Sequence, residues 1–173
     1  MSGAGVKRDI VKEAIGFFFW TGWLKPAPGT WGSLAALPFV WVLHVVGGPG
    51  LLAAAIVAAY VVGLWAIRGL LETSESEDPS EIVIDEVVGM WIAMLPVSLG
   101  AWWADAGLLA LYPGWIAAFL AFRLFDIWKP WLVGKADRRG DALGVMLDDV
   151  WAGVFAGVGT LVLAAASHLF LLA

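Results

Sequence analysis

The chain has 173 residues, of which 61% are hydrophobic and only 14% are charged, and its mean hydropathy is +0.86. A soluble domain of this length could not cover its surface with so few polar residues, so the composition predicts an integral membrane protein. The net charge of −5 gives no indication of a nucleic-acid partner, and we expect none. The absence of cysteine excludes disulfides, thiolate metal sites and thiol nucleophiles.

The first part of the chain predicts a helix that lies along the membrane interface. Over residues 6–15, apolar side chains recur at helical spacing opposite four charged ones. A solvated leader before the first span is an equally good interpretation. The run over residues 14–24 is brief and aromatic, and Lys25 and two prolines follow it instead of a small-residue cleavage site, so we expect this segment to be retained.

Residues 25–33, KPAPGTWGS, are the first candidate site. Two prolines and two glycines predict a tight loop. If a helix begins where this loop ends, its free N–H groups and the hydroxyls of Thr30 and Ser33 could cradle a phosphate, with Lys25 supplying positive charge. The simpler alternative is an ordinary loop with Ser33 as a helix N-cap, since the stretch is not a Walker A motif.

Five apolar runs have spanning or near-spanning length, although the first is short and contains Pro38. They cover residues 34–46, 51–67, 87–104, 108–122 and 150–167. If they cross the membrane in alternation, all ten Lys and Arg residues lie on one side, which the positive-inside rule places in the cytoplasm. His44 and His168 then lie toward the far side, and we assign neither a role.

Two predicted helices share a pattern in which an acidic residue is followed, at spacings of four, by small residues. The pattern is Asp85, Gly89 and Ala93 in a helix expected over residues 81–95, and Asp149, Gly153 and Gly157 in the last helix. Small residues let two helix backbones approach closely, so we expect these faces to pack together. The acidic stretch before them, residues 68–81, is predicted to be a solvated connection.

This packing would bring four carboxylates to one point, those of Asp85, Glu86, Asp148 and Asp149. Four uncompensated carboxylates repel one another strongly. A divalent cation would relieve the repulsion, and oxygen ligands favour magnesium or manganese over zinc. In the alternative interpretation, these acids form structural ion pairs with Arg123, Lys129 and Arg138.

The most densely charged stretch lies between two apolar runs, over residues 122–153. Arg123 and Asp126 are three residues apart and share a face near the end of a helix that Pro130 stops. A new helix is expected to begin near Val145, with two acids in its first turns, where the positive end of the helix dipole favours anions.

Three segments together resemble the phosphatidylglycerophosphatase A family. They are the loop at residues 25–33, DPSEIVIDEVVG at 78–89, and FRLFDIWKP at 122–130 continued by GVMLDDVWAG at 144–153. They occur in the expected order, and the match that they define extends over most of the chain. One departure follows Pro130, where a second proline and an aliphatic residue are expected and Trp131, Leu132 and Val133 occur.

The resemblance implies an all-α fold, with about five spanning helices and an N-terminal interfacial helix in a single domain over residues 1–173. It also implies a magnesium-dependent lipid phosphatase of the bacterial inner membrane, with its active site on the cytoplasmic face. The reaction would remove the terminal phosphate of phosphatidylglycerophosphate to give phosphatidylglycerol. The expected partners are this phospholipid and the membrane, and homo-oligomerisation is left open.

The residues for this reaction fall into three groups. The expected metal ligands are Asp85, Glu86, Asp148 and Asp149. The expected phosphate-binding residues are Lys25, Thr30, Ser33, Arg123 and Lys129. The expected catalytic residues are Asp126, Asp149 and Lys129, with Asp126 serving as base or ligand. Without cysteine or a cytoplasmic histidine, the nucleophile is a metal-activated water or an aspartate.

Two other functions are alternatives to this one. Another membrane enzyme of phospholipid head groups is one, but histidine-dependent lipid phosphatases need a nucleophilic histidine on the active side. CDP-alcohol phosphotransferases use aspartates that recur four residues apart, whereas the acids here are adjacent pairs. The other alternative is an ion transporter that works through carboxylates, whose acids should lie near mid-span. The acids of this chain lie at span ends.

Overall fold

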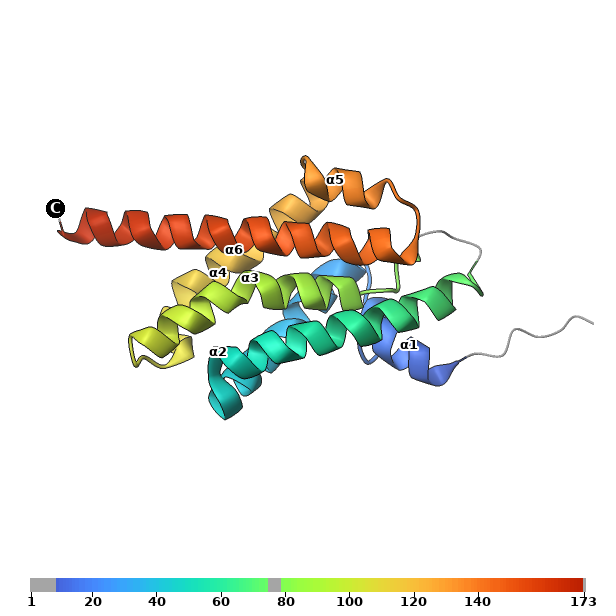
Figure 1. The fold of residues 1–173 in the computed structure, drawn as a ribbon, viewed down its shortest axis with the longest axis horizontal. Helices are drawn as coiled ribbons and strands as arrows, with labels where there is room; N and C mark the ends of the chain where they lie inside the picture. The colour runs from blue at the N-terminus through green and yellow to red at the C-terminus, as the bar shows by residue number, and fades with distance from the viewer. Residues whose placement is uncertain (1–8, 75–78, 173) are drawn as a thin grey trace, which may run out of the picture.

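The computed structural model describes residues 9–74 and 79–172, and within these ranges the chain is helical and contains no strand. Figure 1 shows the helices gathered in one elongated bundle. Their order is α1 (Ile10–Gly16), the short 3-10 helix η1 (Thr21–Trp23), α2 (Pro28–Leu71), α3 (Ile84–Trp103), the 3-10 helix η2 (Leu108–Leu111), α4 (Tyr112–Trp128), α5 (Leu132–Asp137) and α6 (Ala142–Leu172). The predicted all-α fold is confirmed.

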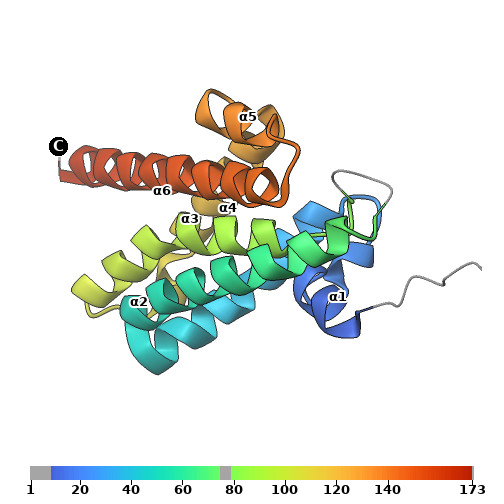
Figure 2. The same ribbon diagram turned by 45° about the vertical axis from the view of Figure 1, so that its right-hand side comes forward.

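The long helix α2 contains two spanning segments. Its 44 residues would measure about 66 Å if straight, roughly twice the hydrocarbon core of a bilayer. The backbone is non-helical at Gly47 and Gly48, and Gly48 has the left-handed φ of 63° that glycine adopts without strain. The chain doubles back there, so that both halves reach the start of α3 (Figures 1 and 2). A Cβ on Gly32 would meet Val83, and one on Gly63 would meet Ile84.

Four helical stretches of the described chain are long and apolar enough to cross a membrane. They are Pro28–Leu71, Ile84–Trp103, Leu108–Trp128 and Ala142–Ser167. Because α2 contains two spanning segments, the four stretches correspond to the five runs predicted from the sequence. Most of α3 is buried by its neighbours, whereas the other stretches expose much of their apolar surface, as expected for helices that face lipid.

The helix boundaries correct several expectations. Residues 28–33 do not form a loop, because α2 already begins at Pro28, a residue whose missing N–H costs nothing in the first turn. Ser33 is consequently not an N-cap. The helix α3 begins at Ile84, three residues later than expected. At α4, the expected stop is found: the helix ends at Trp128, and Lys129 takes a left-handed conformation before Pro130.

The last helix begins at Ala142 and not near Val145. Asp141 caps it, because its Oδ1 accepts a hydrogen bond of 2.7 Å from the N–H of Gly144. Hydrogen bonds from Arg139 and then from Gly144 lower the pKa of Asp141, so the cap stays charged. Asp148 and Asp149 therefore lie in the second turn of α6, farther into the bundle than the sequence predicted.

The first helix is shorter than the amphipathic run suggested. It covers Ile10–Gly16, and residues 6–8 lie outside the described part of the chain. After it, Phe18, Phe19 and Trp20 have positive φ, which prevents the helix from continuing. The N–H of Val83 donates to the Gly16 carbonyl at 2.9 Å and so ties α1 to the start of α3. An interfacial position for α1 stays a prediction.

The helices α3 and α6 touch through the two acid-and-glycine faces. A Cβ on Gly89 would lie 2.6 Å from the carbonyl oxygen of Asp149, and a Cβ on Gly153 would lie 3.0 Å from the carbonyl carbon of Gly89. Only glycine permits so close an approach. This contact brings Asp85 and Asp149 to the same end of the bundle.

The connections divide between two ends of the bundle. Figure 1 shows α1, the end of α2 and the segment between α4 and α6 at one end, with the turn inside α2, the turn after α3 and the end of α6 at the other. This is the grouping that alternating spans predicted. At the far end, His44 Nδ1 lies 2.7 Å from the hydroxyl of Ser98, so this histidine has a local partner.

Candidate active site

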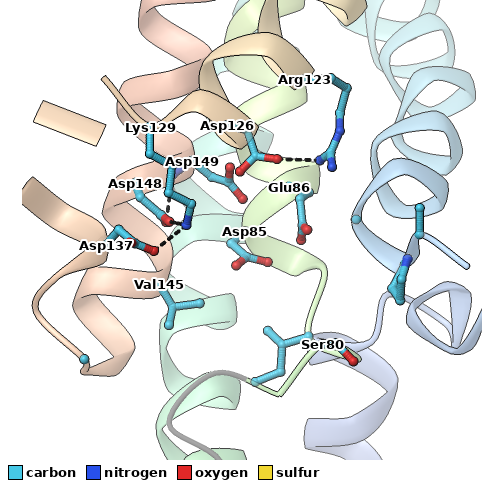
Figure 3. Close-up of a pocket in the computed structure, with 15 residues that line it drawn as sticks. Ser80, Asp85, Glu86, Arg123, Asp126, Lys129, Asp137, Val145, Asp148 and Asp149 are labelled. Carbon is cyan, nitrogen blue, oxygen red and sulfur yellow. Dashed lines mark hydrogen bonds and ion pairs between the residues drawn. The ribbon is translucent and has the colours of Figure 1, made fainter. Parts of the chain in front are cut away.

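A polar pocket of about 360 Å³ opens at the end of the bundle where the charged connections meet (Figure 3). Its walls come from the starts of α2, α3 and α6, the end of α4, and α5 with its connection to α6. The lining residues are Ala27, Pro28, Gly29, Ser80, Ile82, Asp85, Glu86, Arg123, Asp126, Lys129, Asp137, Gly140, Val145, Asp148 and Asp149.

Three carboxylates of the pocket point toward one another, and we refer to Asp85, Glu86 and Asp149 as the carboxylate cluster. Each offers one oxygen, and these atoms lie within 4.8 Å of one another. Asp85 is 7% exposed and Asp149 is 3% exposed. Each of the three also has a buried oxygen with no hydrogen-bond partner among the described residues: Asp85 Oδ1, Glu86 Oε2 and Asp149 Oδ1.

Buried carboxylate oxygens without donors are costly unless a cation compensates them. Carboxylates accept hydrogen bonds but donate none while ionised, so the cluster cannot satisfy itself. A hard divalent cation such as magnesium takes this kind of oxygen ligand. The residues present therefore fit a magnesium ion.

Asp148, the fourth expected ligand, lies outside the carboxylate cluster. Its Oδ2 accepts a hydrogen bond of 2.8 Å from the Lys129 ammonium, and its Oδ1 accepts one of 2.9 Å from the Asp149 N–H. Lys129 donates a second hydrogen bond to Asp137 at the end of α5 (Figure 3). Asp148 and Asp149 are adjacent in the helix and point in different directions, so one meets a cation while the other meets carboxylates.

The Lys129 ammonium stays protonated in this setting. Partial burial acts to lower the pKa of Lys129, but the hydrogen bonds to Asp137 and Asp148 outweigh it and raise the pKa above its ordinary value. A fixed positive charge thus stands at the pocket wall, beside the carboxylate cluster.

A second ion pair lies across the pocket. Arg123 Nη1 is 2.7 Å from Asp126 Oδ2, and both side chains are mostly buried. The same Nη1 lies 3.5 Å from the hydroxyl of Ser33, and Arg123 Nε is buried without a partner in the described ranges. The structural ion-pair interpretation thus holds for Lys129, which pairs with Asp148, but not for Arg123, whose partner Asp126 is not one of the four acids. Arg138 is exposed and pairs with no acid of the described chain.

The segment at residues 25–33 contributes through its backbone. Ala27, Pro28 and Gly29 line the pocket, whereas Lys25 and Thr30 do not. Ser33 is buried, and its hydroxyl donates to the Gly29 carbonyl at 2.7 Å. The first turn of α2, with its unpaired N–H groups, therefore faces the pocket, which favours an anion there.

Gly29 and Asp137 are among the lining residues that the sequence did not predict. A Cβ on Gly29 would collide with the Glu86 carboxylate and lie 3.2 Å from Arg123 Nη1, so glycine lets both side chains approach the α2 backbone. A proline followed by glycine at a helix start could have indicated this turn. Asp137 has no local signal, because its place depends on how α5 folds back over α6.

A pocket of this kind, at the end of a bundle of spanning-length helices, is typical of an integral membrane enzyme that acts on a charged head group. The chain also matches the family model described as phosphatidylglycerophosphatase A over residues 14–164. It belongs to that family and is a membrane phosphatase, so the family predicted from the three segments is confirmed.

Relatives of this chain include phosphatidylglycerophosphatase A of Escherichia coli, which is 34% identical over 143 residues covering 82% of this chain and 75% of the relative. The protein of the same name from Haemophilus influenzae is 32% identical over 145 residues, covering 83% and 81%. A Bacteroides thetaiotaomicron protein provisionally named a phosphatidylinositol-3-phosphatase is 40% identical over 159 residues, covering 86% and 91%. No solved structure matches the chain.

Proposed function

We propose that this protein hydrolyses the terminal phosphate of phosphatidylglycerophosphate to give phosphatidylglycerol and inorganic phosphate, in a magnesium-dependent step of glycerophospholipid biosynthesis. The observation that carries the proposal is the carboxylate cluster, whose three buried oxygens have no partner among the residues described, facing Arg123 and Lys129 in one pocket. We place the site on the cytoplasmic face of the bacterial inner membrane, because the Lys and Arg residues gather at that end.

Asp85, Glu86 and Asp149 would hold the magnesium ion. When bound, the ion would compensate the three carboxylates and stabilise negative charge on the phosphoryl oxygens. Asp148 would act through Lys129, which it holds at the pocket wall. We therefore propose three carboxylate ligands, with Asp148 beside them, in place of the four expected from the sequence.

The phosphate would lie between the cations and the first turn of α2. Arg123 and Lys129 both line the pocket, and charge-assisted hydrogen bonds from such groups are stronger than neutral ones. Ser33 would position Arg123, whose Nη1 it meets. Lys25 and Thr30 flank the lining residues in sequence, and their contact with phosphate stays a prediction.

Asp126 is proposed as the general base. The Arg123 guanidinium holds its carboxylate in place, and a second oxygen remains to accept a proton from an attacking water. Water is favoured over Asp149 as the nucleophile, because Asp149 is almost wholly buried and has its free oxygen turned into the carboxylate cluster. Lys129 would stabilise charge that develops on the phosphoryl group as the bond to the lipid breaks.

The Bacteroides relative supports a second candidate substrate, a phosphoinositide with a phosphate monoester on its ring. Both substrates carry a terminal phosphate on a lipid head group, and the cations of the pocket would contact that shared part. The choice between them depends on the remainder of the head group and is decided by a direct comparison.

The test is phosphate release by the purified protein in mixed micelles, with phosphatidylglycerophosphate or phosphatidylinositol 3-phosphate, with and without EDTA. We expect release from the first lipid, loss with EDTA and recovery with added magnesium. Asp85→Asn should lower kcat by about 10²–10³-fold. Asp105→Asn, at the far end of the bundle, is the matched control and should be unaffected. Activity that resists EDTA, or release from the phosphoinositide alone, would refute the assignment.

A further inference from the structure

The short helix α5 lies on the outside of the bundle, against the first half of α6 (Figures 1 and 2). Val133, Gly134 and Ala136 turn inward and are buried. Within α5, the exposed Leu132 and Lys135 are three residues apart and share the opposite side, and the exposed Trp131, Arg138 and Arg139 flank the helix at its two ends. We call this side the α5 outer face; it consists of Trp131, Leu132, Lys135, Arg138 and Arg139.

The α5 outer face is apolar at its beginning and cationic at its end. Trp131 is 77% exposed, and its ring meets that of Phe155 with centroids 6.2 Å apart. At the other end, a Cβ on Gly144 would lie 2.8 Å from both the Ala136 carbonyl oxygen and the Arg139 Cβ. Gly144 and Phe155 are eleven residues apart in α6, or about 16 Å along its axis. The stretch therefore runs from deep in the bundle back to its polar end.

This direction gives each half of the face a different environment. Phe155 lies six residues, or about 9 Å, beyond Asp149 along α6. The end of the α5 outer face that carries Trp131 is therefore farther from the polar end of the bundle than the pocket is. An exposed tryptophan is favoured where hydrocarbon meets head groups. The cations, at the level of the α6 start, would then lie among the lipid phosphates.

Two of the cations have no acidic partner in the described part of the chain. Arg139 is 3.0 Å from Asp141 and is neutralised by it. Lys135 and Arg138 make no hydrogen bond or ion pair with the residues that the structure describes. Cations beside a membrane surface attract anionic lipids, and each contributes measurably to binding.

We propose that the α5 outer face is a binding site for anionic phospholipids of the surrounding bilayer, separate from the pocket. Lys135 and Arg138 contact the head-group phosphate, and Trp131 and Leu132 pack against the acyl chains below it. A lipid is a better occupant than an acidic protein, because the apolar half lies at a depth that a soluble partner does not reach. The site does not depend on which reaction the pocket performs.

Native mass spectrometry of the detergent-solubilised full chain tests the proposal by counting retained lipids without any turnover. Phosphatidylserine and phosphatidylcholine with identical acyl chains are the probes; both carry a phosphodiester, so neither offers the terminal phosphate of the proposed substrate. The wild type should retain phosphatidylserine in preference. The double variant Lys135→Gln/Arg138→Gln should weaken this retention by about fivefold per cation.

The matched control is Arg68→Gln, which removes an exposed cation at the same end of the bundle but on α2. It should leave the preference unchanged. Trp131→Gln should reduce retention of both lipids while the preference for phosphatidylserine persists. Equal retention of the two lipids by the wild type, or an equal loss in Arg68→Gln and the double variant, would overturn the proposal. Gel filtration confirms that each variant is folded, and a failed phosphatase assay would leave this result intact.

Discussion

Asp148 and Asp149 show how much two adjacent acids can differ. The Asp149 side chain joins the carboxylate cluster, whereas the Asp148 side chain, only 9% exposed, meets the Lys129 ammonium. Side chains at consecutive helix positions point about 100° apart, so two neighbouring residues of one α6 turn can contact different walls of the pocket. We therefore expect the two aspartates to have different roles, one in the carboxylate cluster and one in holding Lys129, and substitutions at the two positions to have different effects.

Magnesium titration of the rate distinguishes the two aspartates. Asp149→Asn removes a proposed ligand and should raise the magnesium concentration needed for half-maximal rate, with a loss of about 10²–10³-fold in kcat. Asp148→Asn keeps the cluster and should lower kcat while leaving the magnesium requirement close to that of the wild type. An equal rise in the requirement for both variants would instead support four ligands.

Gly29 is the residue that lets the Glu86 carboxylate and the Arg123 guanidinium approach the first turn of α2. Gly29→Ala should displace both side chains and lower kcat about tenfold or more, since overpacking costs on the order of 1–3 kcal/mol. Gly50→Ala is the control, because a Cβ there meets nothing within 4 Å. Kinetics of both variants at saturating magnesium provide the measurement, and wild-type kcat in Gly29→Ala would show that this approach is unimportant.

At the scale of elements, the contact between α3 and α6 positions the carboxylate cluster. Both helices carry their acid one turn before a glycine, so the glycine contact sets the distance between Asp85 and Asp149. Helix pairs that pack through small residues gain from close backbone contact, and a single methyl group is enough to separate them.

Gly153→Ala tests this contact. Its Cβ would meet the Gly89 carbonyl, so the variant should be destabilised by about 1–3 kcal/mol. Gly159→Ala lies in the same helix with no atom within 4 Å of its Cβ and should be neutral or slightly stabilising, because alanine is the better helix former by up to about 1 kcal/mol. Thermal unfolding midpoints in detergent compare the two; equal midpoints would mean that α6 can move away from α3 at no cost.

At the scale of the whole molecule, the distribution of charge determines orientation. Every Lys and Arg of the described chain belongs to the segments at the pocket end, whereas the turn after α3 carries Asp105 and no cation. Positive residues are retained on the cytoplasmic side during insertion, so the pocket should open to the cytoplasm.

Thiol labelling of intact cells measures this orientation, because the chain has no cysteine of its own. A cysteine introduced by Ser74→Cys should resist an impermeant reagent until the cells are opened. A cysteine introduced by Gly107→Cys, in the turn after α3, should react at once. The reverse pattern would place the pocket outside.

The architecture was largely predictable from the sequence. The apolar runs can be read directly from the chain, and all Lys and Arg residues lie in alternate connections between them. These two patterns predicted five spans and the grouping of the connections. The spacing of Asp85 with Gly89 and of Asp149 with Gly153 also predicted which helix faces meet, because helical periodicity is local and small residues mark close contacts.

Only the tertiary structure decided which side chains meet in the pocket. Asp137 reaches Lys129 because α5 folds back along α6, and the same ammonium binds Asp148, which lies outside the carboxylate cluster. Gly29 lines the pocket because the first turn of α2, which begins at Pro28, packs against the side chains of Glu86 and Arg123. These contacts join segments far apart in the chain, and their partners depend on how whole helices pack, for which a local pattern carries no signal.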